Sequence, residues 1–192
     1  MKALVMAAAI LPLAACSLGG KLPPSLLNLT SAERLPADTA RTVGAGEAVT
    51  IAVPLVPQAI SGTRLAVNDG ETAVAYVKDA VWVEPPARLF QRLLSETVAA
   101  KTGRVVLDPR QFSFDPGVVL SGQLKSFGVD ARRNEAVIVY DAAMSRNRGD
   151  QVMTRRFEAR VPVVAVEAAE SGAALNRAAN QVANQVAAWL GG

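Results

Sequence analysis

The chain has 192 residues, of which 51% are apolar, 19% charged and 5% aromatic. It contains no histidine and a single cysteine, which excludes an imidazole-based catalytic triad and an internal disulfide. The same counts argue against a zinc site built from several cysteine and histidine ligands, and we expect neither a metal nor a cofactor. A net charge of +3 is too small to predict nucleic-acid binding. The length fits one domain.

The amino terminus has the organisation of a bacterial export signal. Lys2 is followed by an apolar run over residues 3–11, which is shorter than the roughly 20 residues that a membrane-spanning helix needs. The sequence L-A-A-C, ending at Cys16, then resembles a lipobox. This resemblance implies that residues 1–15 are removed and that Cys16 becomes diacylglycerated and N-acylated. Several acyl chains give stable membrane anchoring. The alternative is an ordinary signal peptide followed by a free or buried thiol.

Three segments follow from this interpretation. Residues 1–15 form the signal peptide, residues 16–24 form the lipidated start and a flexible tether, and residues 25–192 form a single domain. Ser17, not an aspartate, follows the cysteine. By resemblance to the enterobacterial sorting rule, this predicts an outer-membrane location facing the periplasm.

The domain itself begins with short extended segments. A short extended piece is expected at 25–30, and alternating β-branched residues predict strands at 48–55, 63–67, 72–77 and 104–107. Three longer strands, 118–129, 135–145 and 152–163, are joined by polar turns that favour an antiparallel meander.

Two helices complete the prediction. Pro85 and Pro86 open the first helix, and Gly103 closes it. A second helix is expected over 171–190, where apolar residues recur at helical spacing. The predicted fold is therefore α+β, a mostly antiparallel β-sheet packed against two main α-helices in a two-layer sandwich.

Several local sequences point to a known family. V-K-D-A-V-W-V-E-P, at 77–85, leads directly into the first helix, and A-V-T-I-A-V-P-L-V-P lies before it. V-V-L-S-G-Q-L-K-S-F-G-V-D and R-R-F-E-A-R-V-P precede the alanine-rich last helix. Together with the lipobox, these sequences resemble the ABC-type transport auxiliary lipoprotein family. The segment S-L-L-N-L departs from the family because it lacks the aromatic pair often found there.

The resemblance implies a function. Family members are lipoprotein partners of MCE-type lipid transport systems in Gram-negative bacteria. We therefore expect a non-enzymatic accessory lipoprotein of the outer membrane that supports transport of lipid or hydrophobic molecules between the two membranes, and envelope integrity. Its expected partners are an MCE-family protein, the permease and ATPase of an ABC transporter, and outer-membrane lipid held through the acyl chains. The transported lipid itself is a further candidate ligand. A homo-oligomer is compatible with an oligomeric partner.

Candidate contact residues are one tryptophan and a group of arginines. Trp82 either contacts a partner or packs the corner between strand and helix. The arginines either form a solvated face or dock an acidic protein surface or anionic headgroups. The arginines of this group are Arg132, Arg133, Arg146, Arg148, Arg155, Arg156 and Arg160. Of these, Arg132, Arg133, Arg155 and Arg156 are the partner-contact candidates that accompany Trp82.

Two other functions stay open at this stage. A lipoprotein enzyme acting on envelope glycans would need two carboxylates brought together in a cleft. The acidic candidates are Asp79, Glu84, Asp108, Asp115, Asp130 and Asp141, and no pair of them is placed together by spacing. An assembly factor for another envelope machine is the other alternative. We expect no catalytic residues.

Overall fold

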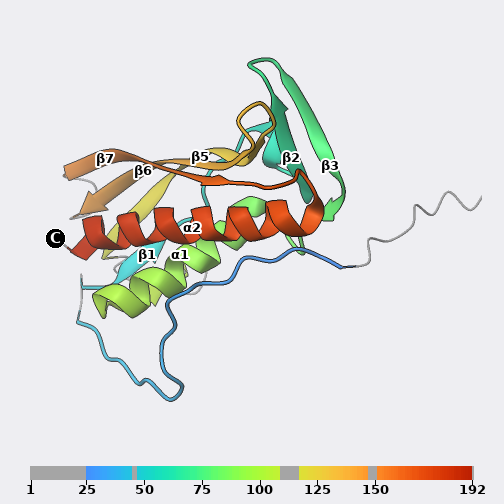
Figure 1. Ribbon diagram of the computed structural model, residues 1–192. Helices are drawn as coiled ribbons and strands as arrows, with labels where there is room; N and C mark the ends of the chain where they lie inside the picture. The colour runs from blue at the N-terminus through green and yellow to red at the C-terminus, as the bar shows by residue number, and fades with distance from the viewer. Residues whose placement is uncertain (1–24, 45–46, 109–116, 147–150, 192) are drawn as a thin grey trace, which may run out of the picture.

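A computed structural model of the protein describes residues 25–44, 47–108, 117–146 and 151–191 (Figure 1). Within these ranges the chain forms two α-helices and one seven-stranded mixed sheet, which confirms the predicted α+β class. The elements in chain order are β1 (Val49–Ile51), the 3-10 helix η1 (Gln58–Ile60), β2 (Arg64–Asp69), β3 (Ala73–Val81), α1 (Pro86–Thr102), β4 (Val106–Leu107), β5 (Val118–Asp130), β6 (Glu135–Arg146), β7 (Gln151–Pro162) and α2 (Ala168–Gly191).

Strand β5 is the centre of the sheet. One of its edges pairs antiparallel with β6 along almost its whole length, and β6 pairs antiparallel with β7, as the predicted meander requires. The other edge is shared, because β1 pairs parallel with the first three residues of β5 and β2 pairs parallel with its last three. β4 then extends the sheet beside β1 in parallel, and β3 extends it beside β2 in the antiparallel direction.

Both helices cover the same face of this sheet (Figure 1). α1 starts with Pro86 in its first turn and ends at Gly103, whose φ of 70° is left-handed and suits a residue without a β-carbon. α2 packs on α1, β6 and β7, and its buried side is made largely of alanine and valine. Within the described ranges, no helix is long and apolar enough to cross a membrane.

The shorter strands differ from the predicted ranges in ways that have physical causes. The strand predicted at 48–55 stops at Ile51, because Pro54 carries no N–H for a ladder bond. The chain rejoins β5 only through a bridge between Leu55 and Gln123. β3 continues four residues beyond its predicted end at 77, through an irregularity in which Asp79 has a φ of 56°.

Residues 25–44 form an extended segment, here called the N-terminal strap, that runs along the two helices (Figure 1). Ser31 Oγ lies 2.9 Å from Thr97 Oγ1 of α1 in a buried hydrogen bond. Asn180 of α2 accepts a bond from the Ala32 N–H at 2.7 Å and donates one to the Thr30 carbonyl at 2.9 Å. The strap is therefore fixed to both helices by specific polar contacts.

Replacing Asn180 by alanine tests this attachment. The substitution leaves the Ala32 N–H and the Thr30 carbonyl without their partner, which we expect to cost about 1–3 kcal/mol of unfolding free energy. Chemical denaturation measures the change. The neighbouring exposed residue provides the control, because Gln181→Ala should stay within about 0.5 kcal/mol of wild type. Equal stability of the two variants would contradict the proposed role of the strap contacts.

Candidate functional site

Trp82 lies in the core, at the corner where β3 turns into α1. Its side chain is 1% exposed and meets the Phe127 ring edge-on at 5.4 Å between centroids. Its backbone forms a parallel bridge with Leu27 of the strap. The indole Nε1 has no hydrogen-bond partner among the described residues, so the ring is held by packing alone. Burial of this kind favours packing of the corner between strand and helix over contact with a partner.

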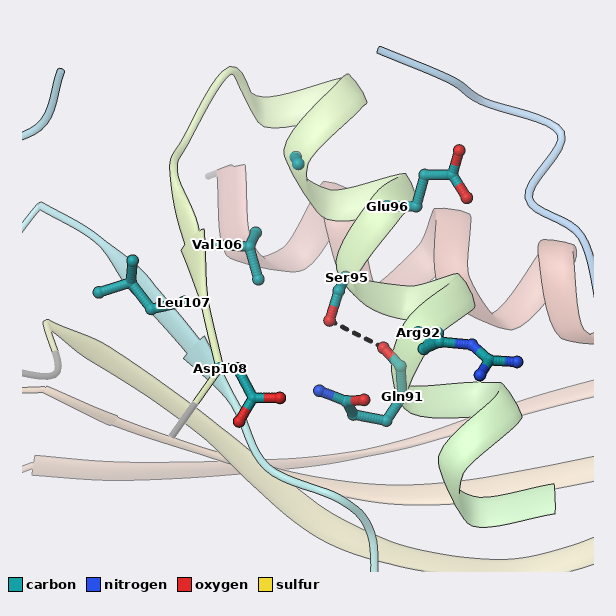
Figure 2. Close-up of a pocket in the computed structure, with 8 residues that line it drawn as sticks. Gln91, Arg92, Ser95, Glu96, Val106, Leu107 and Asp108 are labelled. Atoms are coloured by element: carbon teal, nitrogen blue, oxygen red, sulfur yellow. Dashed lines mark hydrogen bonds between the residues drawn. The ribbon is translucent and has the colours of Figure 1, made fainter. Parts of the chain in front are cut away.

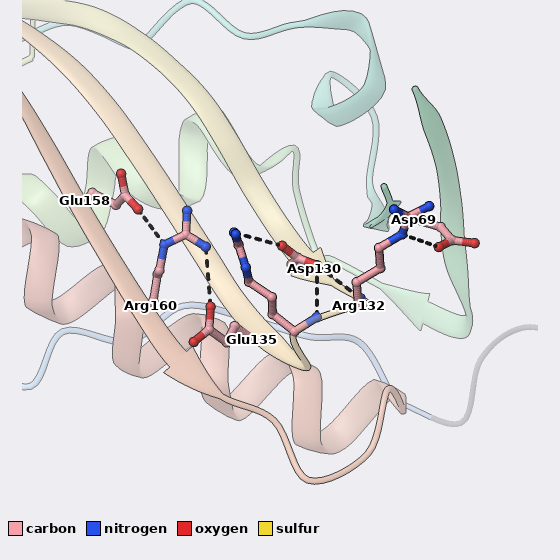
Figure 3. A network of polar contacts seen from close by, with 7 residues as sticks. Asp69, Asp130, Arg132, Glu135, Glu158 and Arg160 are labelled. Carbon is pink, nitrogen blue, oxygen red and sulfur yellow. Dashed lines mark hydrogen bonds and ion pairs between the residues drawn. The ribbon is translucent and has the colours of Figure 1, made fainter. Parts of the chain in front are cut away.

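The candidate arginines that the structure describes lie on β6, on β7 and in the turn between β5 and β6. Four of them pair with a carboxylate, and Figure 3 shows Arg132 and Arg160 among these. In the turn between β5 and β6, Arg132 lies 3.6 Å from Asp69, and Arg133 lies 3.7 Å from Asp130. On β7, Arg160 binds Glu158 at 2.6 Å and Glu135 at 3.3 Å. These ion pairs are solvent-exposed and contribute little stability. The paired carboxylates do lower the net positive charge of this surface compared with that of the arginines alone.

Arg156 and Asp141 form the best-defined pair of this surface. They are opposite each other in the β6–β7 ladder, and the guanidinium donates to both carboxylate oxygens at 2.6 and 2.7 Å. The hydrogen bonds from Arg156, more than its charge at a distance, hold the pKa of Asp141 below its ordinary value. Antiparallel register thus creates a bidentate pair from residues 15 positions apart.

Arg155 differs from its neighbour because strand alternation sends its side chain to the opposite face of the sheet. Its guanidinium carbon lies 5.3 Å from the centre of the Phe157 ring. No carboxylate pairs with it within the described ranges. Met153, on the same face as Arg155, is 43% exposed, and Val152, on the other face of the strand, is 61% exposed. This end of β7 therefore combines an unneutralised cation with exposed apolar side chains.

A hollow of about 440 Å³ lies between α1 and β4 (Figure 2). Its polar groups are largely engaged, since the Ser95 hydroxyl donates to the Gln91 carbonyl and the Gln91 amide donates to the Ile51 carbonyl. Two carboxylates line it, but Glu96 lies at one end and Asp108 at the other, with Ser95 and Gln91 between them (Figure 2). The arrangement does not form the close carboxylate pair that glycan cleavage requires.

The other acidic candidates have separate structural positions. Asp130 accepts hydrogen bonds from the backbone N–H groups of Arg132 and Arg133 and so shapes the β5–β6 turn. Glu84 pairs with Arg92 at 2.7 Å, and Asp79 is exposed in the irregular part of β3. Among the described residues, no cluster of three or more potential metal ligands occurs. Cys16, Asp115 and Arg148 lie outside the described residues.

Comparison with known proteins adds the decisive observation. The family model described as "ABC-type transport auxiliary lipoprotein component" matches residues 28–187. The chain belongs to this family. The match spans most of the strap, the whole sheet and most of α2. Membership identifies it as an auxiliary lipoprotein of an ABC-type transport system, associated with membranes of the cell envelope, and favours a non-catalytic role.

Solved structures show that the fold recurs in distant sequences. Protein XCC0632 from Xanthomonas campestris is 18% identical, with a TM-score of 0.65 over 88% of this chain and 92% of that one. A crystal structure titled as an uncharacterized protein is 12% identical, also with a TM-score of 0.65, over 78% of this chain and 96% of the other. No curated protein matches the sequence.

The contacts of the strap were missed by sequence reasoning. The signal that could have revealed them is Asn180, an amide on the otherwise apolar side of the last helix. A buried amide needs hydrogen-bond partners, and here a distant extended segment supplies them.

Trp82→Ala separates a packing role from a contact role. Because the ring is buried, we expect its removal to cost about 3–5 kcal/mol of unfolding free energy. Trp82→Phe is the matched variant and should lose less, since it keeps an aromatic ring and gives up no hydrogen bond. Thermal unfolding measures both. An alanine variant with unchanged melting and lost partner binding would overturn the packing assignment.

Arg156→Gln tests the electrostatics of the β6–β7 pair. Without the guanidinium, the pKa of Asp141 should rise toward its ordinary value, which carbon-13 NMR titration of the carboxyl group measures directly. Because the folded-state pKa is lowered in wild type, the pair stabilises the protein at neutral pH and loses this effect as pH falls through that pKa. Arg155→Gln is the control and should leave the titration of Asp141 unchanged. An unchanged titration in Arg156→Gln would contradict the bidentate geometry of the pair.

Proposed function

We propose that the protein is a lipid-anchored accessory subunit of an MCE-type ABC transporter, held at the outer membrane and facing the periplasm. The observation that carries this proposal is the family match over 28–187 combined with the lipobox that ends at Cys16. In this role it supports movement of lipid or hydrophobic molecules between the two membranes by binding and assembly. The enzyme alternative gains no support from the separated carboxylates described above.

The proposal assigns different tasks to different parts of the chain. Acylated Cys16 holds the protein at the membrane, and the strap connects the tether to the folded domain. The sheet and helices form a stable body on which partner contacts are displayed. Among the candidate arginines we assign partner contact first to Arg155, because it has an exposed apolar neighbourhood and no paired carboxylate in the described ranges. Arg132, Arg133 and Arg156 are secondary candidates, since a partner must compete with their carboxylates.

Cys16→Ala is the direct test. The variant should lack acylation by mass spectrometry, leave the outer-membrane fraction, and fail to recover an MCE protein in a pull-down that succeeds with wild type. Ser17→Ala is the control, because it keeps the cysteine and introduces no aspartate after it. Acylated wild-type protein that recovers no MCE or ABC component from crosslinked membranes would overturn the proposed function.

The salt response of the same pull-down tests the arginine contacts. If Arg155 and its neighbours bind acidic groups, recovery of the partner should fall steeply as salt is added, because exposed charge pairs are screened. Recovery that does not change between low and high salt would exclude them as the main contact.

A further inference from the structure

A second exposed surface lies at the end of the molecule where the described chain begins. The strap pairs there with the end of β3: the Leu27 N–H donates to the Val81 carbonyl at 2.8 Å, and the Val83 N–H donates to the Leu27 carbonyl at 2.9 Å. In such pairing Leu27 and Trp82 point into the core, so their neighbours Leu26 and Val83 point outward. These outward residues are 53% and 41% exposed.

The same outward surface continues along β3. Arg64 is paired with Val81 across the β2–β3 ladder, and its guanidinium carbon stacks 3.7 Å from the centre of the Tyr76 ring. Tyr76 and Val74, two residues apart on one side of β3, are 36% and 47% exposed. We call Leu26, Val83, Arg64, Tyr76 and Val74 the anchor-side strip. It combines aliphatic groups with an arginine and a tyrosine, side chains that place an apolar body beside a polar tip.

The number of residues between Cys16 and the domain limits how far the strip can lie from a membrane that holds an acylated Cys16. Residues 16–24 are nine in number and span at most roughly 30 Å when fully extended. The strip lies at the end of the molecule where α2 begins, since Leu27, the neighbour of the strip residue Leu26, contacts the first turn of α2: a β-carbon on Gly172 would be 2.8 Å from Leu27 Cδ2. α2 has 24 residues and is therefore about 36 Å long, with the start of β7 near its far end (Figure 1). An anchor on Cys16 keeps the strip close to the bilayer and lets the opposite end face away.

We propose that the anchor-side strip rests on the lipid bilayer and fixes the orientation of the domain on the membrane. The inference deepens the proposed function and relies on acylation of Cys16. Lipid is the favoured occupant because the tether delivers this end of the molecule to the membrane surface, where tyrosine and arginine are suited to the boundary between headgroups and acyl chains. Once the acyl chains are inserted, the strip meets lipid at high effective concentration, so a small apolar area is sufficient for contact.

Three valines allow a matched test. Val74→Cys and Val83→Cys place a thiol on the strip, and Val152→Cys places one at the opposite end, at a site that is 61% exposed. The chain has no other cysteine than Cys16, whose thiol is blocked by the lipid, so each variant offers one thiol for an environment-sensitive fluorophore. The labelled, acylated proteins are confirmed by mass spectrometry and reconstituted into vesicles of phosphatidylethanolamine and phosphatidylglycerol, with or without lipids that carry a spin label on the acyl chain.

The expected result is a rise in fluorescence of about twofold or more for the probes at 74 and 83, with quenching by the spin-labelled lipid, while the probe at 152 changes little. High salt should not reverse the effect, because the contact is mainly apolar. An increase in fluorescence without quenching by the spin-labelled lipid would mean that a protein, such as a second copy of the chain, covers the strip. This result would overturn the proposal. Equal behaviour of all three probes would overturn it as well. Because acylation is confirmed before the measurement, either of these results would contradict contact between the strip and lipid, and would not contradict acylation of Cys16.

Discussion

Burial of one sheet face beneath α1 and α2 is the constraint on which the rest of the structure depends. The buried side of α2 is dominated by small residues, which let the helix approach both α1 and the β6–β7 strands closely. Aromatic contacts join the layers where more volume is needed, with Phe90 of α1 against Tyr140 of β6 and Trp189 of α2 against Phe157 of β7. Because both helices lie on this side of the sheet, many side chains of β3 and β7 remain exposed.

Polar groups have different roles in the buried core and on the exposed surface. Inside, they are few and serve structure: the buried Tyr140 hydroxyl donates to the Ser121 carbonyl, and burial raises the pKa of this hydroxyl well above its ordinary value. Outside, arginines and carboxylates face one another across β6, β7 and the adjoining turn. The polar contacts of the described residues join strands and turns to one another, and exposed apolar side chains lie at both ends of the molecule.

Local sequence patterns predicted most of the helices and strands of the fold. The β5–β6–β7 meander was predictable because its turns are short, and α1 because proline and glycine mark its ends. The parallel pairing of β1 and β2 with β5 was not predictable, since residues such as Val49 and Val118 are far apart in sequence and no local pattern specifies such a partner. Of the site, the arginines were identified but not their carboxylate partners, because the pairing of Arg156 with Asp141 depends on register. The burial of Trp82 likewise depends on the strap that crosses it.

With the proposed anchor at one end and exposed side chains at the other, the domain would connect a membrane with a transport complex. The most direct test of this account is lipid transfer between two vesicle populations, one containing a purified MCE-type transporter and the other carrying the acylated protein. The account predicts that fluorescent lipid transfer increases several-fold when the acylated protein is on its own vesicles, and that the unacylated Cys16→Ala protein does not produce the increase. Transfer that proceeds equally with and without the protein would contradict it.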